Sequence, residues 1–181
     1  MGGRSGGRAR ARLSHVDARG RVRMVDVGDK PVTERLAVAR GHIAIGRAAL
    51  RAVRGGRLAK GDPLEAARIA GIMAAKRTSE LVPLCHPLPL SQVDVSLYPR
   101  PDGYDIEARV RTTARTGVEM EALTAVATAA LTVYDMVKAV DKRMIIGAIH
   151  LIEKTGGRSG TFRAAAAGAS AVTRRRRSGG G

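Results

Sequence analysis

The feature that most constrains this chain is a long apolar run in its C-terminal half, TAVATAALTVYDMVKAV. Thr116 and Glu119 just before it have the spacing of a capping box, so we expect a helix over about 117–141. Alanine, leucine, valine and methionine fill the interior of this helix, which is too apolar to be surrounded by water. It must be a core element of the fold or lie at a subunit interface.

Several segments alternate apolar and polar residues, as strands with one buried face do. Strands are expected over 35–45, 91–98, 104–113 and 143–152, with a further extended segment over 21–27. In the first of these strands one face carries Ala37, Ala39, Gly41, Ile43 and Ile45. Asp102-Gly103 predicts a hairpin turn between the second and third strands.

Two helices are expected before the hairpin. A short helix over 46–54 precedes a longer one, for which Asp62 suits the N-cap and Pro63 the first helical position. The longer helix should run to about Ser79, with Ile69, Ile72 and Met73 on its apolar face. The order of elements favours an α+β fold, a mainly antiparallel sheet with helices packed on one face, in a ferredoxin-like αβ sandwich.

The net charge of +16 suggests an anionic partner, but half of it lies in two short terminal segments. Residues 1–12 and 164–181 each carry four arginines and no acid, and their Gly-, Ala- and Ser-rich composition predicts disordered tails around a catalytic domain at 13–163. The tails are expected to make only weak, non-specific contacts with polyanions. A nucleic-acid-binding or scaffold protein is the alternative, although the chain has one Phe, three Tyr and no Trp for base stacking.

The cellular location is indicated by what the sequence contains. Cys85 is the only cysteine, so the chain has no intrachain disulfide, and a reducing compartment is natural for it. No stretch approaches about 18 uninterrupted apolar residues, and the Arg-rich start is not followed by an apolar segment. We therefore expect a cytoplasmic protein without a membrane span.

Asp135 and Lys138 are charged residues on one face of the apolar helix, at spacing i, i+3. One interpretation is an ordinary surface ion pair near a helix end. The other is a general acid/base couple in which each group shifts the pKa of its partner. Lys60, just before the start of the Asp62 helix, is either a solvated loop lysine or a phosphate contact beside a helix N-terminus.

His86 lies in the segment LVPLCHPLPL, where three prolines fix the backbone and so hold the imidazole ring in place. Cys85 beside it does not form a zinc site, because the sequence offers no second ligand pair at a suitable spacing. The glycines of KTGGRSG resemble a phosphate-binding loop but lack the P-loop spacing. Together these features suggest an enzyme that holds a phosphorylated ligand without a tightly bound metal.

Four strings in this order and spacing resemble the cyclic pyranopterin monophosphate synthase family of molybdenum cofactor biosynthesis: MVDVGDK, KGDPLEAARIAGIMAAKRTSELVPLCHPL, TGVEMEALTAVATAALTVYDMVKAV and EKTGGRSG. The resemblance covers about residues 13–163. It implies a lyase that converts 3′,8-cyclo-7,8-dihydroguanosine triphosphate to cyclic pyranopterin monophosphate and releases pyrophosphate.

The resemblance also implies roles for individual residues. Asp135, Lys138 and Lys60 match the family's catalytic residues, and the substrate-binding segments contain Leu84, Cys85, His86, Met120 and Glu121. It implies a small-molecule triphosphate substrate and a homohexamer, a trimer of dimers with active sites at subunit interfaces. No cofactor is required, and Mg²⁺ can accompany the substrate phosphates.

Overall fold

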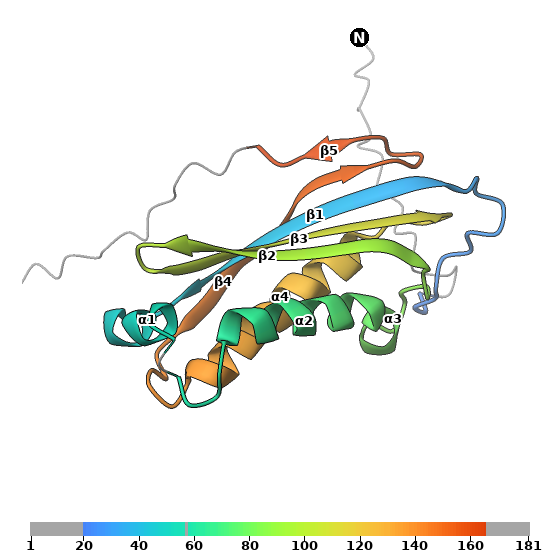
Figure 1. Cartoon of the computed structure of the whole chain (residues 1–181). Helices are drawn as coiled ribbons and strands as arrows, with labels where there is room; N and C mark the ends of the chain where they lie inside the picture. The colour runs from blue at the N-terminus through green and yellow to red at the C-terminus, as the bar shows by residue number, and fades with distance from the viewer. Residues whose placement is uncertain (1–19, 57, 166–181) are drawn as a thin grey trace, which may run out of the picture.

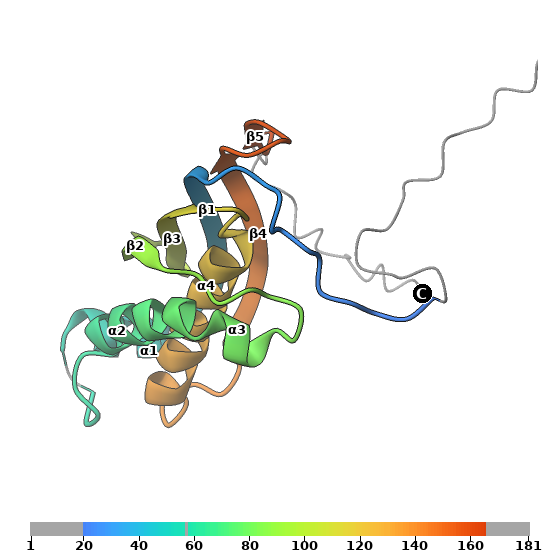
Figure 2. The same cartoon turned by 90° about the vertical axis from the view of Figure 1, so that its right-hand side faces the viewer.

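The computed structural model describes residues 20–56 and 58–165, so nearly all of both expected tails lies outside it. One five-stranded antiparallel sheet carries the helices on one face (Figures 1 and 2). In chain order the elements are β1 Thr33–Ala44, α1 Arg47–Arg54, α2 Pro63–Lys76, α3 Thr78–Leu81, β2 Leu90–Arg100, β3 Gly103–Ala114, α4 Glu119–Val137, β4 Ile145–Thr155 and β5 Phe162–Arg163.

The strand order is β2-β3-β1-β4-β5, with β1 in the centre, antiparallel to β3 on one side and β4 on the other. The first four strands, with helices after β1 and β3, have the arrangement of a ferredoxin-like sandwich, so the expected α+β fold class is confirmed. Strand β5 was not expected. It adds to the edge of β4 through the pairs Glu153↔Arg163 and Lys154↔Phe162.

The core lies between the sheet and α4. The face of β1 expected from its alternation is buried, and α4 packs on β1, β3 and β4. At Gly41 the helix comes so close that an added Cβ would lie 2.7 Å from a methyl carbon of Val126. The buried side of α4 consists of Glu121, Ala122, Ala125, Val126, Ala129, Ala130, Val133 and Val137. The apolar helix is therefore a core element, as one of the two sequence interpretations held.

The expected ends of α4 were wrong. The helix begins at Glu119, not after a Thr116 cap, and it ends at Val137 instead of near residue 141. The Glu119 carboxylate folds back over Gly117 and pairs with Lys154 at 3.3 Å, so it does not close a capping box. A turn over 138–140 then redirects the chain toward β4.

Within residues 20–56 and 58–165, α4 is the one helix long and apolar enough to cross a membrane, with a mean hydropathy of 1.3. Burial against the sheet accounts for part of that composition, because the residues facing β1 and β3 are fully enclosed by protein. The same length and composition are found in core helices of soluble proteins, so this helix is weak evidence for a membrane span.

Helix α2 starts as the sequence predicts. The Asp62 carboxylate accepts hydrogen bonds from the backbone N–H groups of Leu64 and Glu65, at 2.8 and 3.3 Å. The helix ends earlier than expected, at Lys76. The buried Thr78 hydroxyl donates to the carbonyl oxygens of the last turn, and a separate short helix, α3, follows.

The apolar face assigned to α2 was wrong for two of its residues. Ile69 and Met73 are 58% and 52% exposed, whereas the buried face consists of small residues. An added Cβ at Gly71 would lie 3.0 Å from the carbonyl oxygen of Ala125 on α4. Small residues therefore face inward because α2 and α4 pack closely, and the larger side chains are left on the outside of the helix pair.

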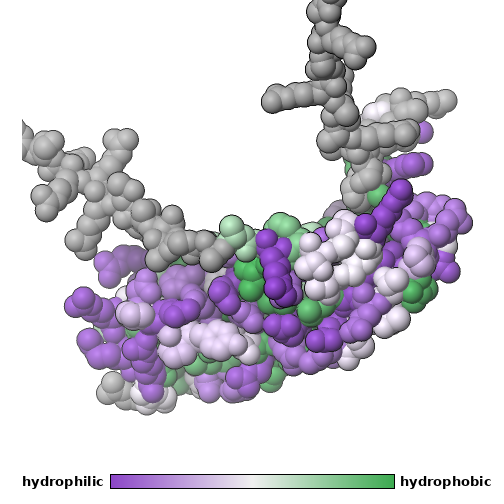
Figure 3. All heavy atoms as spheres, turned by 90° about the horizontal axis from the view of Figure 1, so that it is seen from above, coloured by the Kyte–Doolittle hydropathy of each residue, from purple (hydrophilic) through white to green (hydrophobic). Residues whose placement is uncertain are grey.

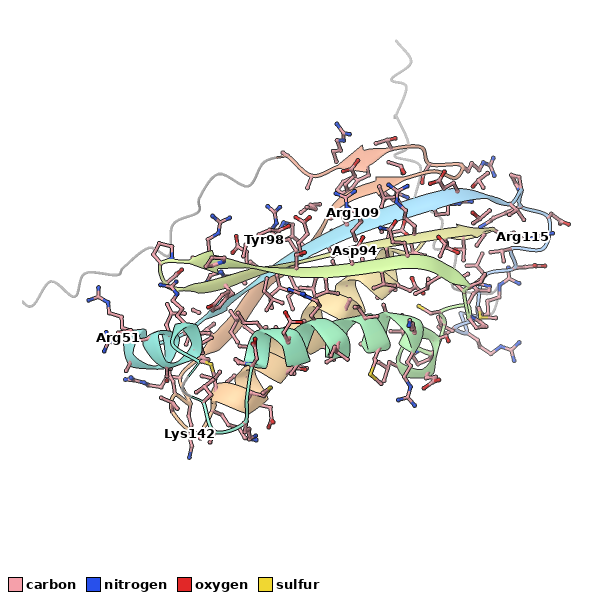
Figure 4. The ribbon with its side chains drawn as sticks, viewed as in Figure 1. Arg51, Asp94, Tyr98, Arg109, Arg115 and Lys142 are labelled. Carbon is pink, nitrogen blue, oxygen red and sulfur yellow. The ribbon has the colours of Figure 1, made fainter. Side chains whose placement is uncertain are left out.

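The other face of the sheet, here called the open face, is mostly hydrophilic, with an apolar area near its middle (Figure 3). Tyr98, Asp94 and Arg109 lie on it, as Figure 4 shows. Polar side chains pair across its strands: Arg40 forms an ion pair with Glu107, and the His42 ring lies in hydrogen-bond contact with Asp105 at 2.8 Å. Because both signs of charge are interspersed, this face does not form the single-sign patch typical of nucleic-acid binding.

Two glycines, on the two strands that flank β1, give a matched test of the packing. A Cβ at Gly103 would collide with the Ile43 carbonyl group on β1, whereas a Cβ at Gly147 would meet nothing within 4 Å. We expect Gly103→Ala to destabilise the fold by about 2 kcal/mol or more, because the strands must separate. Gly147→Ala should be neutral or stabilising, by up to about 1 kcal/mol. Urea unfolding of both variants would measure the difference, and equal effects would contradict it.

Candidate active site

Lys60, Asp135 and Lys138 form a compact group, the lysine–aspartate cluster. Lys138 Nζ donates to Asp135 Oδ1 at 2.6 Å, and Lys60 Nζ donates to Asp135 Oδ2 at 3.0 Å. Lys60 Nζ also donates to the Asp135 carbonyl oxygen at 3.2 Å. Lys138 directly follows α4, while Lys60 comes from the loop between α1 and α2, so the structure brings together the three residues expected to carry catalysis.

The protonation of this cluster follows from its contacts. Hydrogen bonds from Lys138 and Lys60 hold the pKa of Asp135 below its usual value. The hydrogen bond to Asp135 raises the pKa of Lys138 in return. At neutral pH the aspartate is therefore ionised and Lys138 is protonated. The cluster combines one proton acceptor with two cationic donors on a surface about half exposed to water.

A cavity of about 410 Å³, here called the His86 pocket, lies apart from this cluster. It is lined by Leu84, Cys85, His86, Met120 and Glu121. The proline-rich loop forms one wall of this pocket and the first turn of α4 forms another. Val25 and Val27 close it from the N-terminal side. The segment 21–27 runs extended there, with a single bridge at residue 22, and does not form a strand. All five residues expected to bind substrate thus lie together.

Glu121 is a buried carboxyl at the base of the His86 pocket, with 4% of its surface exposed. Burial raises its pKa to about 7, and the charge of Glu119 adds to the shift, against a hydrogen bond from its own backbone N–H. Burial and the charge of Glu121 also raise the pKa of the Cys85 thiol. Cys85 is therefore a thiol at neutral pH, which suits a wall of the pocket better than a nucleophile.

Another cavity of about 420 Å³, here called the cationic basin, adjoins the His86 pocket. The two share Lys30, Thr116, Gly117 and Glu119. Among the described residues that line it, Glu119 is the only acidic one. Against that single carboxylate stand five basic side chains, those of Lys30, Arg35, Arg115, Lys154 and Arg158. Such an excess of positive charge in a concave site favours a ligand with several phosphate groups.

Sequence reasoning missed most of this basin. Lys154 and Arg158 lie in the KTGGRSG segment, whose glycines had suggested phosphate binding, and this was the one available signal. Arg35 lies near the start of β1, and Arg115 directly follows the end of β3. The antiparallel register of the two strands brings them together. Gly156 and Gly157 both have positive φ, and a Cβ on Gly157 would collide with the Arg35 guanidinium, so glycine there admits the arginine to the basin.

The two groups of predicted residues lie far apart in one chain. Glu121 and Asp135 are fourteen residues apart on α4, which separates them by about 21 Å along the helix axis. Figure 4 shows the same separation, with Arg115 of the basin at one end of the molecule and Lys142, near the cluster, at the other. A single chain therefore does not bring the lysine–aspartate cluster to the His86 pocket.

A larger hollow, about 760 Å³, lies elsewhere, between α1, the start of α2 and the β2–β3 hairpin. Its walls are mostly aliphatic, and Arg54 is the only basic side chain among the described residues that line it. Across residues 20–56 and 58–165, no group of three or more His, Cys, Asp or Glu side chains could hold a metal ion.

Known proteins resemble the chain over most of its length. Residues 24–157 match the model of the MoaC family. A relative from Thermomicrobium roseum, named cyclic pyranopterin monophosphate synthase, is 63% identical over 155 residues, which cover 84% of this chain and 93% of the relative. Relatives with the same name from Chloroflexus aggregans and Pelotomaculum thermopropionicum are 60% and 57% identical, each over 83% of this chain and over 93% and 89% of their own lengths.

Glu121 predicts a dependence of stability on pH. Its folded-state pKa of about 7 lies above the ordinary value of 4.5, so the folded protein binds more protons than the unfolded chain between these pH values. The free energy of unfolding should therefore fall as pH rises from about 4.5 to 7, by up to about 3 kcal/mol.

Glu121→Gln should remove this fall and leave the variant more stable than the wild type at pH 8. Urea unfolding at pH 4.5, 6 and 8 would measure it, with the exposed Glu65→Gln as control. If both variants keep the wild-type pH dependence, Glu121 is not the titrating group.

Proposed function

This chain belongs to the MoaC family, and from that membership we propose that it acts as a cyclic pyranopterin monophosphate synthase in molybdenum cofactor biosynthesis. It is a lyase that converts 3′,8-cyclo-7,8-dihydroguanosine triphosphate to cyclic pyranopterin monophosphate with release of pyrophosphate. The carrying observation is the high identity to relatives of that name over more than four-fifths of the chain. We place this reaction in the cytoplasm.

The two adjoining cavities suit the two parts of this substrate. The His86 pocket, with Leu84, Cys85 and Met120 on its walls, has the apolar surface and few polar groups that a purine-derived ring system requires. The cationic basin next to it offers five basic side chains for the triphosphate. The proposal includes no protein-bound cofactor, and Mg²⁺ enters only as a companion of the substrate phosphates.

The protonation states favour particular roles in the lysine–aspartate cluster. Ring rebuilding needs proton transfers, and closure of the cyclic phosphate expels pyrophosphate, on which negative charge develops. Asp135, held ionised, suits the acceptor of a proton. Lys138, held protonated, suits a donor, and Lys60 beside it adds a second cation near the departing phosphates.

We infer that a second copy of the chain completes each active site. Glu121, Thr128 and Asp135 are spaced by seven residues along α4, with Thr128 midway. Glu121 is buried beside the His86 pocket, whereas Thr128 is partly exposed and Asp135 is exposed. A two-fold axis across α4 near Thr128 would turn the helix end for end. The partner's Asp135 would then lie over the His86 pocket, and because such a contact is reciprocal, two identical sites would result.

The surface around Thr128 supports this contact. Thr128 and Met73 line one shallow hollow of about 520 Å³ between α2 and α4. Large apolar side chains stand exposed around it, namely Ile69, Met73, Leu81 and Leu131, each between 52% and 62% exposed. Exposed apolar residues gathered in this way are typical of a surface that another protein covers. The family resemblance extends the pair to a trimer of dimers, with a mass six times the 19.0 kDa of one chain.

The activity is tested with purified protein and the cyclic GTP intermediate. The wild type should form cyclic pyranopterin monophosphate and an equal amount of pyrophosphate. Asp135→Asn and Lys138→Ala should each lower kcat by about 100-fold or more, because each removes a group that transfers a proton. The control is Lys142→Ala, an exposed lysine four residues beyond Lys138. Product formation at the wild-type rate in the Asp135 and Lys138 variants would refute these roles.

Sharing of sites between copies is tested by mixing two inactive variants. Asp135→Asn and His86→Ala are unfolded together and refolded as a mixture. In a mixed dimer one site combines both defects, while the other receives intact Asp135 and intact His86. About one quarter of the wild-type activity should therefore return. If the mixture stays as inactive as each variant alone, the site lies within one chain.

A further inference from the structure

The two lysines of the lysine–aspartate cluster reach Asp135 from separate segments. Lys138 directly follows α4, whereas Lys60 lies at the end of the segment that starts with α1. The place of Lys60 beside Asp135 therefore depends in part on how the start of α1 is held against the end of α4, two parts of the chain about 90 residues apart. The side chain of Asp141 connects these parts.

Asp141 lies in the turn between α4 and β4, and its side chain is only 9% exposed. Its Oδ2 accepts a hydrogen bond from the backbone N–H of Gly46 at 2.8 Å, directly before α1. Its Oδ1 accepts one from the backbone N–H of Arg143 at 2.9 Å. The Arg143 guanidinium is 93% exposed, with its Nε 3.7 Å from Oδ1, so the two backbone groups are the close partners.

The position before α1 is shaped to receive this carboxylate. Gly46 is the N-cap of α1, and no side chain of α1's own segment caps the helix. An added Cβ at Gly46 would lie 2.6 Å from Asp141 Oδ2, so only glycine leaves room for it. A carboxylate at a helix N-terminus is also favoured by the helix dipole. Asp141 thus supplies, from a distant segment, the hydrogen-bond acceptor for the N-terminus of α1 that the residues around α1 do not provide.

The turn that carries Asp141 is itself fixed to α4. The backbone N–H of Asp141 donates to the carbonyl of Val137 at 3.2 Å, and that of Lys138 donates to Tyr134 at 2.9 Å. The Tyr134 hydroxyl donates to the carbonyl of Lys142 at 3.0 Å. The turn is therefore fixed to the end of α4. The Asp141 carboxylate, through its hydrogen bond to Gly46, fixes the start of α1 to the same turn. The two backbone hydrogen bonds also lower the pKa of Asp141, which keeps it ionised.

We propose that Asp141 is a positioning residue of the reaction, which sets the spacing of Lys60 and Lys138 around Asp135 by tying α1 to the turn after α4. The proposal rests on the function proposed above for the lysine–aspartate cluster. Asp141 does not contact the cluster side chains and acts only through the backbone. A role in stability alone would make no difference to the pKa of Asp135, which Lys60 helps to lower.

The test compares Asp141→Ala, Asp141→Asn and Gly46→Ala. The first removes both hydrogen bonds, and the second retains one acceptor oxygen. The third forces the carboxylate away while leaving Asp141 in the chain, and it serves if Asp141→Ala does not fold. Asp94→Ala is the control, an exposed acid on β2 whose partner is the Gln92 side chain.

The first measurement needs no substrate. Side-chain NMR titration of Asp135 should show its pKa rising toward the ordinary aspartate value in Asp141→Ala and Gly46→Ala, because Lys60 is one of the two donors that lower it, with a smaller change in Asp141→Asn. The Asp94→Ala control should match the wild type. An unchanged Asp135 pKa in variants that lose thermal stability would overturn the proposal and leave Asp141 a structural residue. This result holds even if the proposed substrate proves wrong.

The second measurement is the pH profile of turnover. In Asp141→Ala, kcat should fall about 10- to 100-fold, as small displacements of catalytic groups do, while KM stays within about two-fold of the wild type. The pH limb that belongs to Asp135 should move in the same direction as its NMR titration. Asp141→Asn should retain an intermediate rate. Equal kcat and an unmoved limb in a folded Asp141→Ala protein would contradict the positioning role.

Discussion

The close approach of α4 to its neighbours is the constraint on which the rest of this structure depends. Gly41 on β1 and Gly71 on α2 are the points where a side chain would not fit against the helix. Because each of these glycines has only a hydrogen atom as its side chain, α4 packs closely against both the sheet and α2. This placement fixes both of its ends, with the His86 pocket at the first turn and Asp135 near the last. The residues expected to bind substrate and those expected to carry catalysis therefore lie near opposite ends of one helix.

Charge in the described part of the chain is organised locally. Five basic side chains converge on the basin, while the open face of the sheet pairs its arginines with carboxylates. In the lysine–aspartate cluster the same attraction keeps Asp135 ionised and Lys138 protonated. Burial does the opposite for Glu121, whose pKa rises because its carboxyl lies away from water. The excess of positive charge is thus most concentrated at a site sized for a small anion, and the scaffold alternative finds no support in this distribution.

Local patterns in the sequence predicted the elements well wherever local forces decide the structure. Alternation gave the buried face of β1, and Asp62 with Pro63 gave the start of α2, because caps and pleats act within a few residues. The i, i+3 spacing of Asp135 and Lys138 predicted their ion pair for the same reason. The family resemblance, not the pattern, brought Lys60 and the five residues of the His86 pocket into the expected site.

Predictions failed where distant segments decide the outcome. Ile69 and Met73 looked like a core face, but close packing at Gly71 turned the small residues of α2 inward instead. Glu119 had the spacing for a cap, yet Lys154 from β4 attracts its carboxylate. Arg35 and Arg115 carry no local signal at all, because only the register of β1 with β3 brings them to one basin. The contact of Asp141 with Gly46 is hidden in the sequence for the same reason.

Glu121 and Asp135 are fourteen positions apart on α4, so the helix fixes their separation as well as forming part of the core. Each residue added to an α-helix advances the chain by about 1.5 Å and rotates it by about 100°. One insertion within α4 would turn Asp135 away from the side it shares with Thr128, although every side chain of the site would still be present. The surface loops can change length without such an effect, because their ends are fixed by the sheet. Natural variation in length should therefore gather in the loops and at the chain ends, while α4 keeps its count of turns.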